Sequence, residues 1–191
     1  MSVRLLFPST LYQVNISNHQ QINAEIVPTL INLKNTTPQG GDPWVGFVYN
    51  TMGTYEVHNN PLFETLCREV EKHVGRFAKE LNVHRDIKFS CHQSWANIYE
   101  MHSYQESHFH PYATFSAVYY AKTTANTKII FENPVEDMFS LQTEVQTDIN
   151  KTYEIIYPKD GDLIIFRSYL RHNIPPHCDV EPRVTIAFNF K

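Results

Sequence analysis

The chain has 191 residues, with 16 basic against 20 acidic side chains and a formal net charge of −4. This balance excludes a protein that binds nucleic acid through a basic face, and a mean hydropathy of −0.38 without a long apolar run excludes a membrane span. The length predicts a single domain over residues 1–191. Three scattered cysteines without a CxxC spacing predict free thiols in a reducing compartment, and hence a cytoplasmic protein.

Helical periodicity dominates the first half of the chain, after one or two short strands within residues 3–16. Apolar residues at helical spacing predict a helix over about 19–33, capped by Ser17 or Asn18. A second helix is predicted over 61–82, with Asn60 as its cap and Pro61 at its first position. These elements predict a helical support over about 18–82, in which a loop at 34–43 and an extended segment at 44–52 join the helices.

From about residue 87 the apolar pattern changes to period two, interrupted by turns, which is typical of short strands. A core built of strands is therefore predicted over about 87–191, with a polar excursion at 134–150. Helices followed by many short strands predict a mainly β protein with flanking helices, in which the helices pack on a sandwich or barrel. The predicted strands cover 87–99, a short segment from 108, then 115–121, 128–131, 153–156, 163–166 and 183–190.

Ten histidines are present, and histidine is the commonest metal ligand among side chains. His108 and His110 stand two apart in a segment predicted to be extended, so both imidazoles would point to the same face and could reach one ion. His172 follows the predicted strand 163–166 and is a third candidate ligand. Of the other seven histidines, four lie in the helical half or in loops and need no function, with surface positions predicted for two of them: His19, His58, His73 and His84, of which the last two are the surface pair. The remaining three, His92, His102 and His177, are candidates to line a pocket or to support its residues.

Arg183 opens the last predicted strand, and Thr185 shares its face two residues on. An arginine that points into a β core needs an anionic partner, because a buried unpaired charge is very costly. Together the guanidinium and the hydroxyl predict a clamp for a carboxylate. A surface ion pair with the nearby Glu181 is the alternative interpretation of Arg183.

An ordered set of motifs runs along much of the chain: Leu6–Tyr12, Ser94–Tyr99, His108–Pro111, Phe115–Tyr120, Ile130–Pro134, Gly161–Phe166 with His172, and Arg183–Phe190. This set resembles the Fe(II)- and 2-oxoglutarate-dependent dioxygenases, and more narrowly the prolyl-hydroxylase-like oxygenases of bacteria and phages, cyanophages included. The resemblance implies a double-stranded β-helix (jelly-roll, cupin-like) core, and an enzyme that uses Fe(II), 2-oxoglutarate and O₂ to hydroxylate a C–H bond with release of succinate and CO₂. It also implies the host cytoplasm if the chain is encoded by a phage.

The resemblance also implies roles for individual residues. His108 would be the first iron ligand and His172 the distal one, while Arg183 would hold the distal carboxylate of 2-oxoglutarate. Around the cofactor, Tyr120 and Thr185 would assist in binding, and Asn97 and Tyr99 would line the pocket.

One position departs from the usual set of two histidines and a carboxylate, because His110 stands where the carboxylate is expected. A site of three histidines is the first interpretation, and a carboxylate borrowed from Glu106 or Glu132 is the second. Two other functions stay open at this point: a cupin-like three-histidine enzyme without 2-oxoglutarate, and a non-catalytic jelly-roll that serves as a binding or structural module. The expected partner is a small-molecule or peptide substrate, with no nucleic acid and no membrane, and a homodimer stays open.

Overall fold

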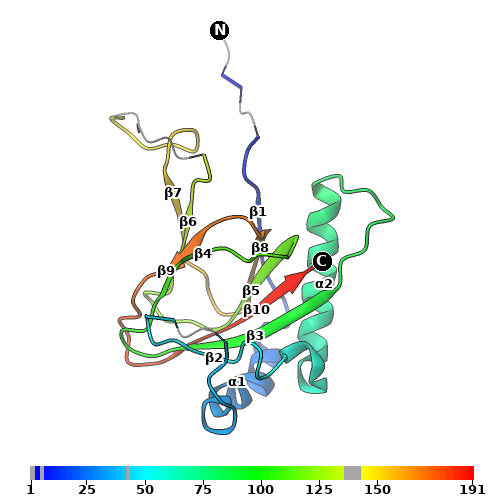
Figure 1. Ribbon diagram of the computed structural model, residues 1–191, viewed down its shortest axis with the longest axis vertical. Helices are drawn as coiled ribbons and strands as arrows, with labels where there is room; N and C mark the ends of the chain where they lie inside the picture. Colours follow the sequence, from blue (N-terminus) through cyan, green and yellow to red (C-terminus); the bar gives the residue numbers. More distant parts are fainter. Residues whose placement is uncertain (1–2, 5–6, 42–43, 136–142) are drawn as a thin grey trace.

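Two antiparallel sheets face each other in the computed structural model, which describes residues 3–4, 7–41, 44–135 and 143–191 (Figure 1). The six-stranded sheet has the order β1-β8-β5-β10-β3-β2 and the four-stranded sheet the order β4-β9-β6-β7. The larger sheet consists of β1 (Leu11–Asn15), β2 (Tyr49–Asn50), β3 (Cys91–Tyr99), β5 (Phe115–Lys122), β8 (Asp162–Arg167) and β10 (Arg183–Phe190). The smaller consists of β4 (Gln105–His108), β6 (Ile129–Glu132), β7 (Tyr153–Ile156) and β9 (His172–Ile174).

Strand β10 lies in the middle of the larger sheet, between β3 and β5, and both of its faces are buried. Its even-numbered residues, such as Ile186 and Phe188, belong to the core beneath the helices. Its odd-numbered residues, including Arg183 and Thr185, face the space between the two sheets, because successive side chains of a strand alternate. The strand therefore carries polar side chains into the interior on one face only.

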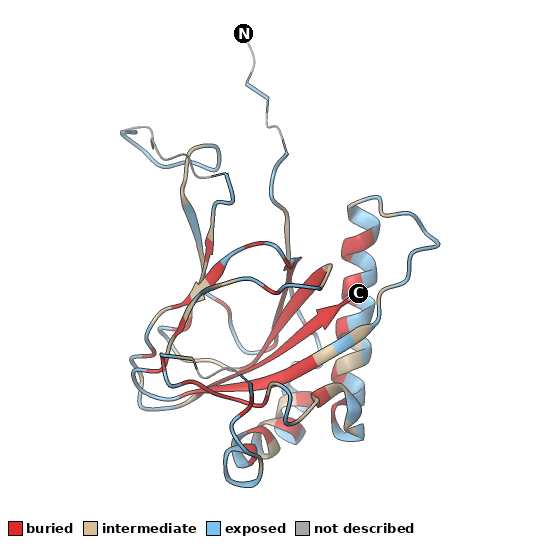
Figure 2. Cartoon of the chain, viewed as in Figure 1, coloured by how far each residue is buried: buried red, intermediate tan, exposed pale blue. Residues whose placement is uncertain are grey.

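Helices α1 (His19–Thr36) and α2 (Glu64–Glu80) cover the outer face of the larger sheet (Figures 1 and 2). The buried stripe of α1 is the one that the apolar spacing predicts, with Ile22, Ile26, Leu30 and Leu33. The buried face of α2 follows its apolar spacing in part and also includes His73. A second buried cluster, which includes Tyr120, Phe131 and Phe166, fills the space between the sheets. The predicted mainly β architecture with flanking helices is confirmed.

Several boundaries differ from the sequence expectation. The predicted helix 61–82 begins with a 3₁₀ turn at Pro61–Phe63, over which the Asn60 side chain accepts the N–H of Leu62, and the α-helix proper is shorter at both ends. A further 3₁₀ turn covers Val57–Asn59. Of the segment 44–52 only β2 is a strand, and β3 starts at Cys91 rather than at 87. The excursion 134–150 lies partly outside the described residues.

The prediction that His73 lies on the surface is wrong, since only 4% of this residue is exposed. Its Nδ1 is 2.9 Å from the hydroxyl of Tyr12 in β1, so the ring joins α2 to the edge of the larger sheet. A neutral imidazole has only one donor and one acceptor nitrogen, so few partners are needed to bury it, and its polar character does not by itself place it on the surface.

The helices of the described segments are all too short or too polar to cross a membrane. The three cysteines Cys67, Cys91 and Cys178 carry free thiols.

Candidate metal and cofactor site

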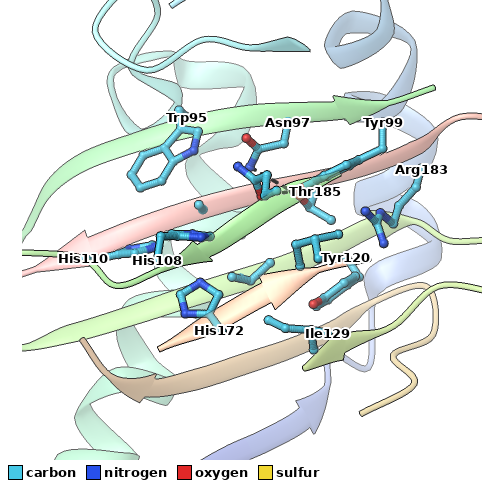
Figure 3. A pocket seen from close by; sticks show the side chains of 14 residues that line it. Trp95, Asn97, Tyr99, His108, His110, Tyr120, Ile129, His172, Arg183 and Thr185 are labelled. Carbon is cyan, nitrogen blue, oxygen red and sulfur yellow. Dashed lines mark hydrogen bonds between the residues drawn. The ribbon is translucent and has the colours of Figure 1, made fainter. Parts of the chain in front are cut away.

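Three histidines from two strands and one loop converge between the sheets (Figure 3). His108 ends β4, His110 lies two residues beyond it, and His172 opens β9 directly opposite His108. Their candidate ligand atoms lie within 4.8 Å of one another, and the ring centroids of His108 and His172 are 4.2 Å apart. Within the part of the chain that the structure describes, this is the one cluster of three or more potential ligands.

Hydrogen bonds orient the rings of His108 and His172, in each case through Nδ1. His108 donates its Nδ1–H to the backbone carbonyl of Glu106 over 2.7 Å, and His172 donates its Nδ1–H to that of Leu170 over 3.0 Å. A carbonyl oxygen only accepts, so the proton must be on Nδ1 in both rings. The lone pair of each Nε2 is therefore free for a metal ion.

His110 is held by side chains rather than by backbone. Its Nδ1 lies 2.7 Å from Oδ1 of Asn189 and 3.0 Å from the hydroxyl of Ser116. Because the Asn189 amide nitrogen donates to the Gln93 side chain over 3.1 Å, its oxygen must face the histidine. Nδ1 of His110 is accordingly a donor, and its Nε2 is free like those of the other two rings.

Burial keeps the three rings neutral. It lowers the pKa of His110 to about 4 and takes that of His172 well below the ordinary value of 6.5. Burial also lowers the pKa of His108, against the opposing effect of the Glu106 carbonyl and of the carboxylates of Glu106 and Glu132. Neutral imidazoles are the form that binds metal ions.

The cluster differs in two respects from the sequence expectation. His110 is not on a strand with His108, because β4 ends at His108, and the His110 N–H bonds instead to the carbonyl of Ser168 over 3.0 Å. The two rings nevertheless stack at 5.5 Å with an interplanar angle of 15°. Neither Glu106 nor Glu132 belongs to the group of ligand atoms, and Glu132 accepts a hydrogen bond from Asn173.

Arg183 lies at the other end of the same narrow cavity (Figure 3). It is only 2% exposed, and its guanidinium lies 3.8 Å from the centre of the Tyr99 ring. Nη1 makes one long hydrogen bond to the carbonyl of Lys128, whereas Nε and Nη2 have no partner among the described residues. Glu181, the alternative partner from the sequence, pairs with Lys122. A buried cation with two free donors needs an anionic ligand.

The remaining predicted residues line this cavity between the histidines and Arg183. The hydroxyl of Tyr120 is buried and lacks a partner within the described segments, while the Asn97 amide donates to Thr185 over 3.5 Å. Burial raises the pKa of Tyr120 above its ordinary value and that of Tyr99 to about 12, so both phenols stay protonated. The Tyr99 hydroxyl is already bonded to Gln105, which leaves its ring to support Arg183.

Sequence reasoning missed several residues of this site. Trp95, Gln105 and the apolar side chains of Val118, Ile129 and Ile174 also line the cavity. Asn189, which orients His110, shares the inward face of β10 with Arg183 and Thr185. Because side chains alternate along a strand, counting every second residue from Arg183 could have identified it. In contrast, the candidates His92, His102 and His177 do not line the cavity, and His177 bonds to the carbonyl of Glu181.

The donors present fit a metal ion together with a dicarboxylate. Three free imidazole nitrogens are ligands that iron accepts, and they leave coordination positions open for another molecule. At the far end, the unpartnered Nε and Nη2 of Arg183 can give a carboxylate a two-point contact, and the free Tyr120 hydroxyl adds a third donor. A ligand that spans both ends would satisfy polar atoms that the described residues leave unsatisfied.

Comparison with known proteins agrees with this chemistry. Residues 93–189 match the family model 2OG-FeII_Oxy_5, a 2OG-Fe(II) oxygenase family. A search of curated proteins found no significant relative. Among solved structures, a prolyl-4-hydroxylase from Pseudomonas putida matches 96% of this chain and 92% of its own length, with 11% identity and a TM-score of 0.64.

Two further structures share the fold at similar identity. A prolyl hydroxylase from Trichoplax adhaerens, solved with a peptide fragment of the hypoxia inducible factor, has 12% identity and a TM-score of 0.65 over 94% of this chain and 82% of its own. HygX from Streptomyces hygroscopicus, solved with nickel and 2-oxoglutarate, has 10% identity and a TM-score of 0.61 over 95% of this chain and 82% of its own. These likenesses confirm the predicted jelly-roll core.

Proposed function

Because the chain belongs to the 2OG-Fe(II) oxygenase family, whose cofactors are iron and 2-oxoglutarate, we propose that His108, His110 and His172 hold Fe(II) and that Arg183 anchors the distal carboxylate of 2-oxoglutarate. One observation carries this assignment: a single cavity has three free imidazole nitrogens at one end and a buried, unpartnered guanidinium at the other. The bound iron and 2-oxoglutarate supply, with O₂, the oxidising power to hydroxylate a C–H bond, with release of succinate and CO₂.

Around the cofactor, each neighbouring residue has a separate task. The unpartnered Tyr120 hydroxyl would donate to the carboxylate held by Arg183, and the Thr185 hydroxyl and Asn97 amide, which line the same cavity, would assist in binding. The ring of Tyr99 holds the guanidinium plane in place. Apolar side chains such as Ile129 and Val118 exclude water from the cavity, which strengthens the contact between guanidinium and carboxylate.

Three neutral imidazoles make this site less negative than one with a ligand carboxylate. The protein then contributes no charge to the metal, and the dianionic 2-oxoglutarate alone balances Fe(II). His110 is as firmly oriented as the other two rings, through Asn189, Ser116 and Gln93. This support favours three histidines over a carboxylate borrowed from Glu106 or Glu132.

The substrate that we propose is a small molecule or a peptide, because the structural neighbours include an enzyme crystallised with a peptide and one crystallised with hygromycin B. We further propose a cytoplasmic enzyme of bacterial or phage origin, since free thiols suit a reducing compartment. A homodimer stays part of this proposal, to be tested by light scattering.

An anaerobic titration tests the assignment. Fe(II) followed by 2-oxoglutarate is expected to produce the visible metal-to-ligand charge-transfer band of a chelated 2-oxoacid. Arg183→Ala should retain iron binding but lose most of the affinity for 2-oxoglutarate, whereas Arg167→Ala, which removes an exposed arginine, should behave as wild type. Iron binding without the band would favour the cupin-like alternative, and no iron binding would favour a non-catalytic jelly-roll.

A further inference from the structure

An aromatic ring lies against the one partly exposed histidine of the three-histidine cluster. Of the three histidines only His108 is partly exposed, while His110 and His172 are buried. The indole of Trp44 lies against His108, with ring centroids 4.7 Å apart and an interplanar angle of 58°. A substrate that reaches the cluster past His108 therefore comes close to this indole.

The backbone fixes the position of Trp44. The turn Trp44–Phe47 is closed by a hydrogen bond from the Phe47 N–H to the Trp44 carbonyl, and the Gly46 carbonyl accepts the Tyr104 N–H over 3.0 Å. A Cβ on Gly46 would lie 2.1 Å from the Tyr104 carbonyl oxygen, so only glycine allows this approach. Phe47 has φ of 55°, a strained value for a bulky residue. Such strain is kept where a structure needs one particular geometry, and Phe47 closes the turn that begins at Trp44.

A carboxylate without a partner precedes His108 in the chain. Both carboxylate oxygens of Glu106 are buried without a hydrogen-bond partner in the described segments, and Glu106 lies only two residues before His108. The Arg171 guanidinium, next to His172 in the chain, lies over the ring of Phe109 at 5.1 Å. An aromatic face together with an unpartnered carboxylate suits a cation.

We propose that Trp44 is a specificity-determining residue of this oxygenase. The indole face of Trp44 binds a positively charged group of the substrate, and Glu106 is the anionic partner of that group. The inference rests on the proposed function and names the substrate class for that site: a molecule or side chain that carries an ammonium or guanidinium group. The cation is held at the entrance, and the carbon to be hydroxylated extends past His108 towards the metal.

A pair of matched probes tests this assignment. N-acetylarginine amide and N-acetylcitrulline amide have nearly the same shape but differ in charge. Each is titrated anaerobically into protein loaded with Fe(II) and 2-oxoglutarate, and binding is followed by the change in the charge-transfer band. The arginine derivative should perturb the band saturably and bind at least roughly fivefold more tightly than the citrulline derivative. Equal binding of the two, or no perturbation by the arginine derivative, would overturn the proposal.

Variants separate the indole from general effects on folding. Trp44→Leu should weaken binding of the arginine derivative by roughly fivefold to tenfold, while Trp44→Phe, which keeps an aromatic face, should stay within about threefold of wild type. Glu106→Gln should reduce the preference for arginine over citrulline. Tyr157→Leu removes an exposed ring elsewhere and serves as the matched control.

The outcomes also separate this inference from the proposed function. A normal charge-transfer band in Trp44→Leu, with unchanged binding of the arginine derivative, contradicts the role of Trp44 alone. Absence of the band in wild-type protein contradicts the proposed function and the inference together. Circular dichroism of each variant shows whether it is folded, and the Phe variant decides the matter if the Leu variant is not.

Discussion

His110 donates its Nδ1–H to the side-chain oxygen of Asn189 over 2.7 Å, although 79 positions separate the two residues in the chain. The bond joins the loop after β4 to the end of strand β10, and Ser116 of β5 donates to the same oxygen over 2.9 Å. All three residues are buried. A polar network in this position is costly unless every group is satisfied, and its effect is to fix one tautomer of one candidate metal ligand.

Loss of this support should weaken metal binding. Asn189→Leu, which has a similar volume but no acceptor, is expected to reduce the affinity for Fe(II) by roughly 10- to 100-fold. Asn189→Asp keeps an acceptor for His110 and serves as the matched variant, with affinity near wild type. Equilibrium dialysis against Fe(II) under nitrogen gives the affinity. An Asn189→Leu protein that is folded and binds iron normally would show that His110 needs no such support.

The identity of the third ligand can be decided by three substitutions. His110→Ala should weaken Fe(II) binding by more than the roughly 100-fold expected from the loss of a supporting residue. Glu106→Gln and Glu132→Gln should leave it within about threefold, because neither carboxylate belongs to the cluster. If the glutamate variants lose iron while His110→Ala retains it, the site uses a carboxylate after all. The same anaerobic dialysis measures every variant.

Tryptophan fluorescence should report metal binding directly. The chain has two tryptophans, and both lie against candidate ligands: Trp44 is 4.7 Å from His108 and Trp95 is 5.5 Å from His110, measured between ring centroids. Co(II), an open-shell ion, is expected to quench most of the emission and to saturate at one equivalent, whereas Zn(II) should quench little. His172→Ala should abolish the Co(II) effect. Quenching that persists in this variant would locate the ion elsewhere.

Stability should depend on pH through His73. Burial, aided by Arg76 and Lys72, lowers the pKa of His73 in the folded protein below its ordinary value of 6.5. Below about pH 6.5 the unfolded chain therefore takes up a proton that the folded protein does not bind, so the free energy of unfolding should fall as the pH decreases from there towards the lower folded pKa.

Two glutamine variants isolate this effect. Urea unfolding of metal-free protein between pH 7 and pH 5 should show a weaker pH dependence in His73→Gln than in wild type. His84→Gln changes an exposed histidine of the helical half of the chain and should leave the pH dependence of the unfolding free energy as in wild type. Identical slopes in the two variants would mean that His73 does not contribute to acid lability.

The helices and the central strands could be predicted because their signals are local. The apolar stripe of α1 and the alternation in β10 each follow from the period of one element, and burial follows from that period. Boundaries were less predictable, because the start of α2 depends on a 3₁₀ turn and on the Asn60 side chain rather than on hydrophobic spacing.

Residue order alone determined that His108, His110, His172 and Arg183 were the chemical candidates, since each stands at a recognisable place in a run of strand patterns. It could not decide which nitrogen of each ring is free, whether Arg183 has an ion-pair partner, or that Trp44 lies against His108. The contacts of His110, Arg183 and Trp44 join residues far apart in the chain, and they depend on how β4, β9 and β10 pack around one cavity. The bonds of His108 and His172 go to carbonyls only two residues away, and they depend on the local backbone conformation. Hydrogen bonds at fixed distance and buried charges without partners exist only once that packing is made.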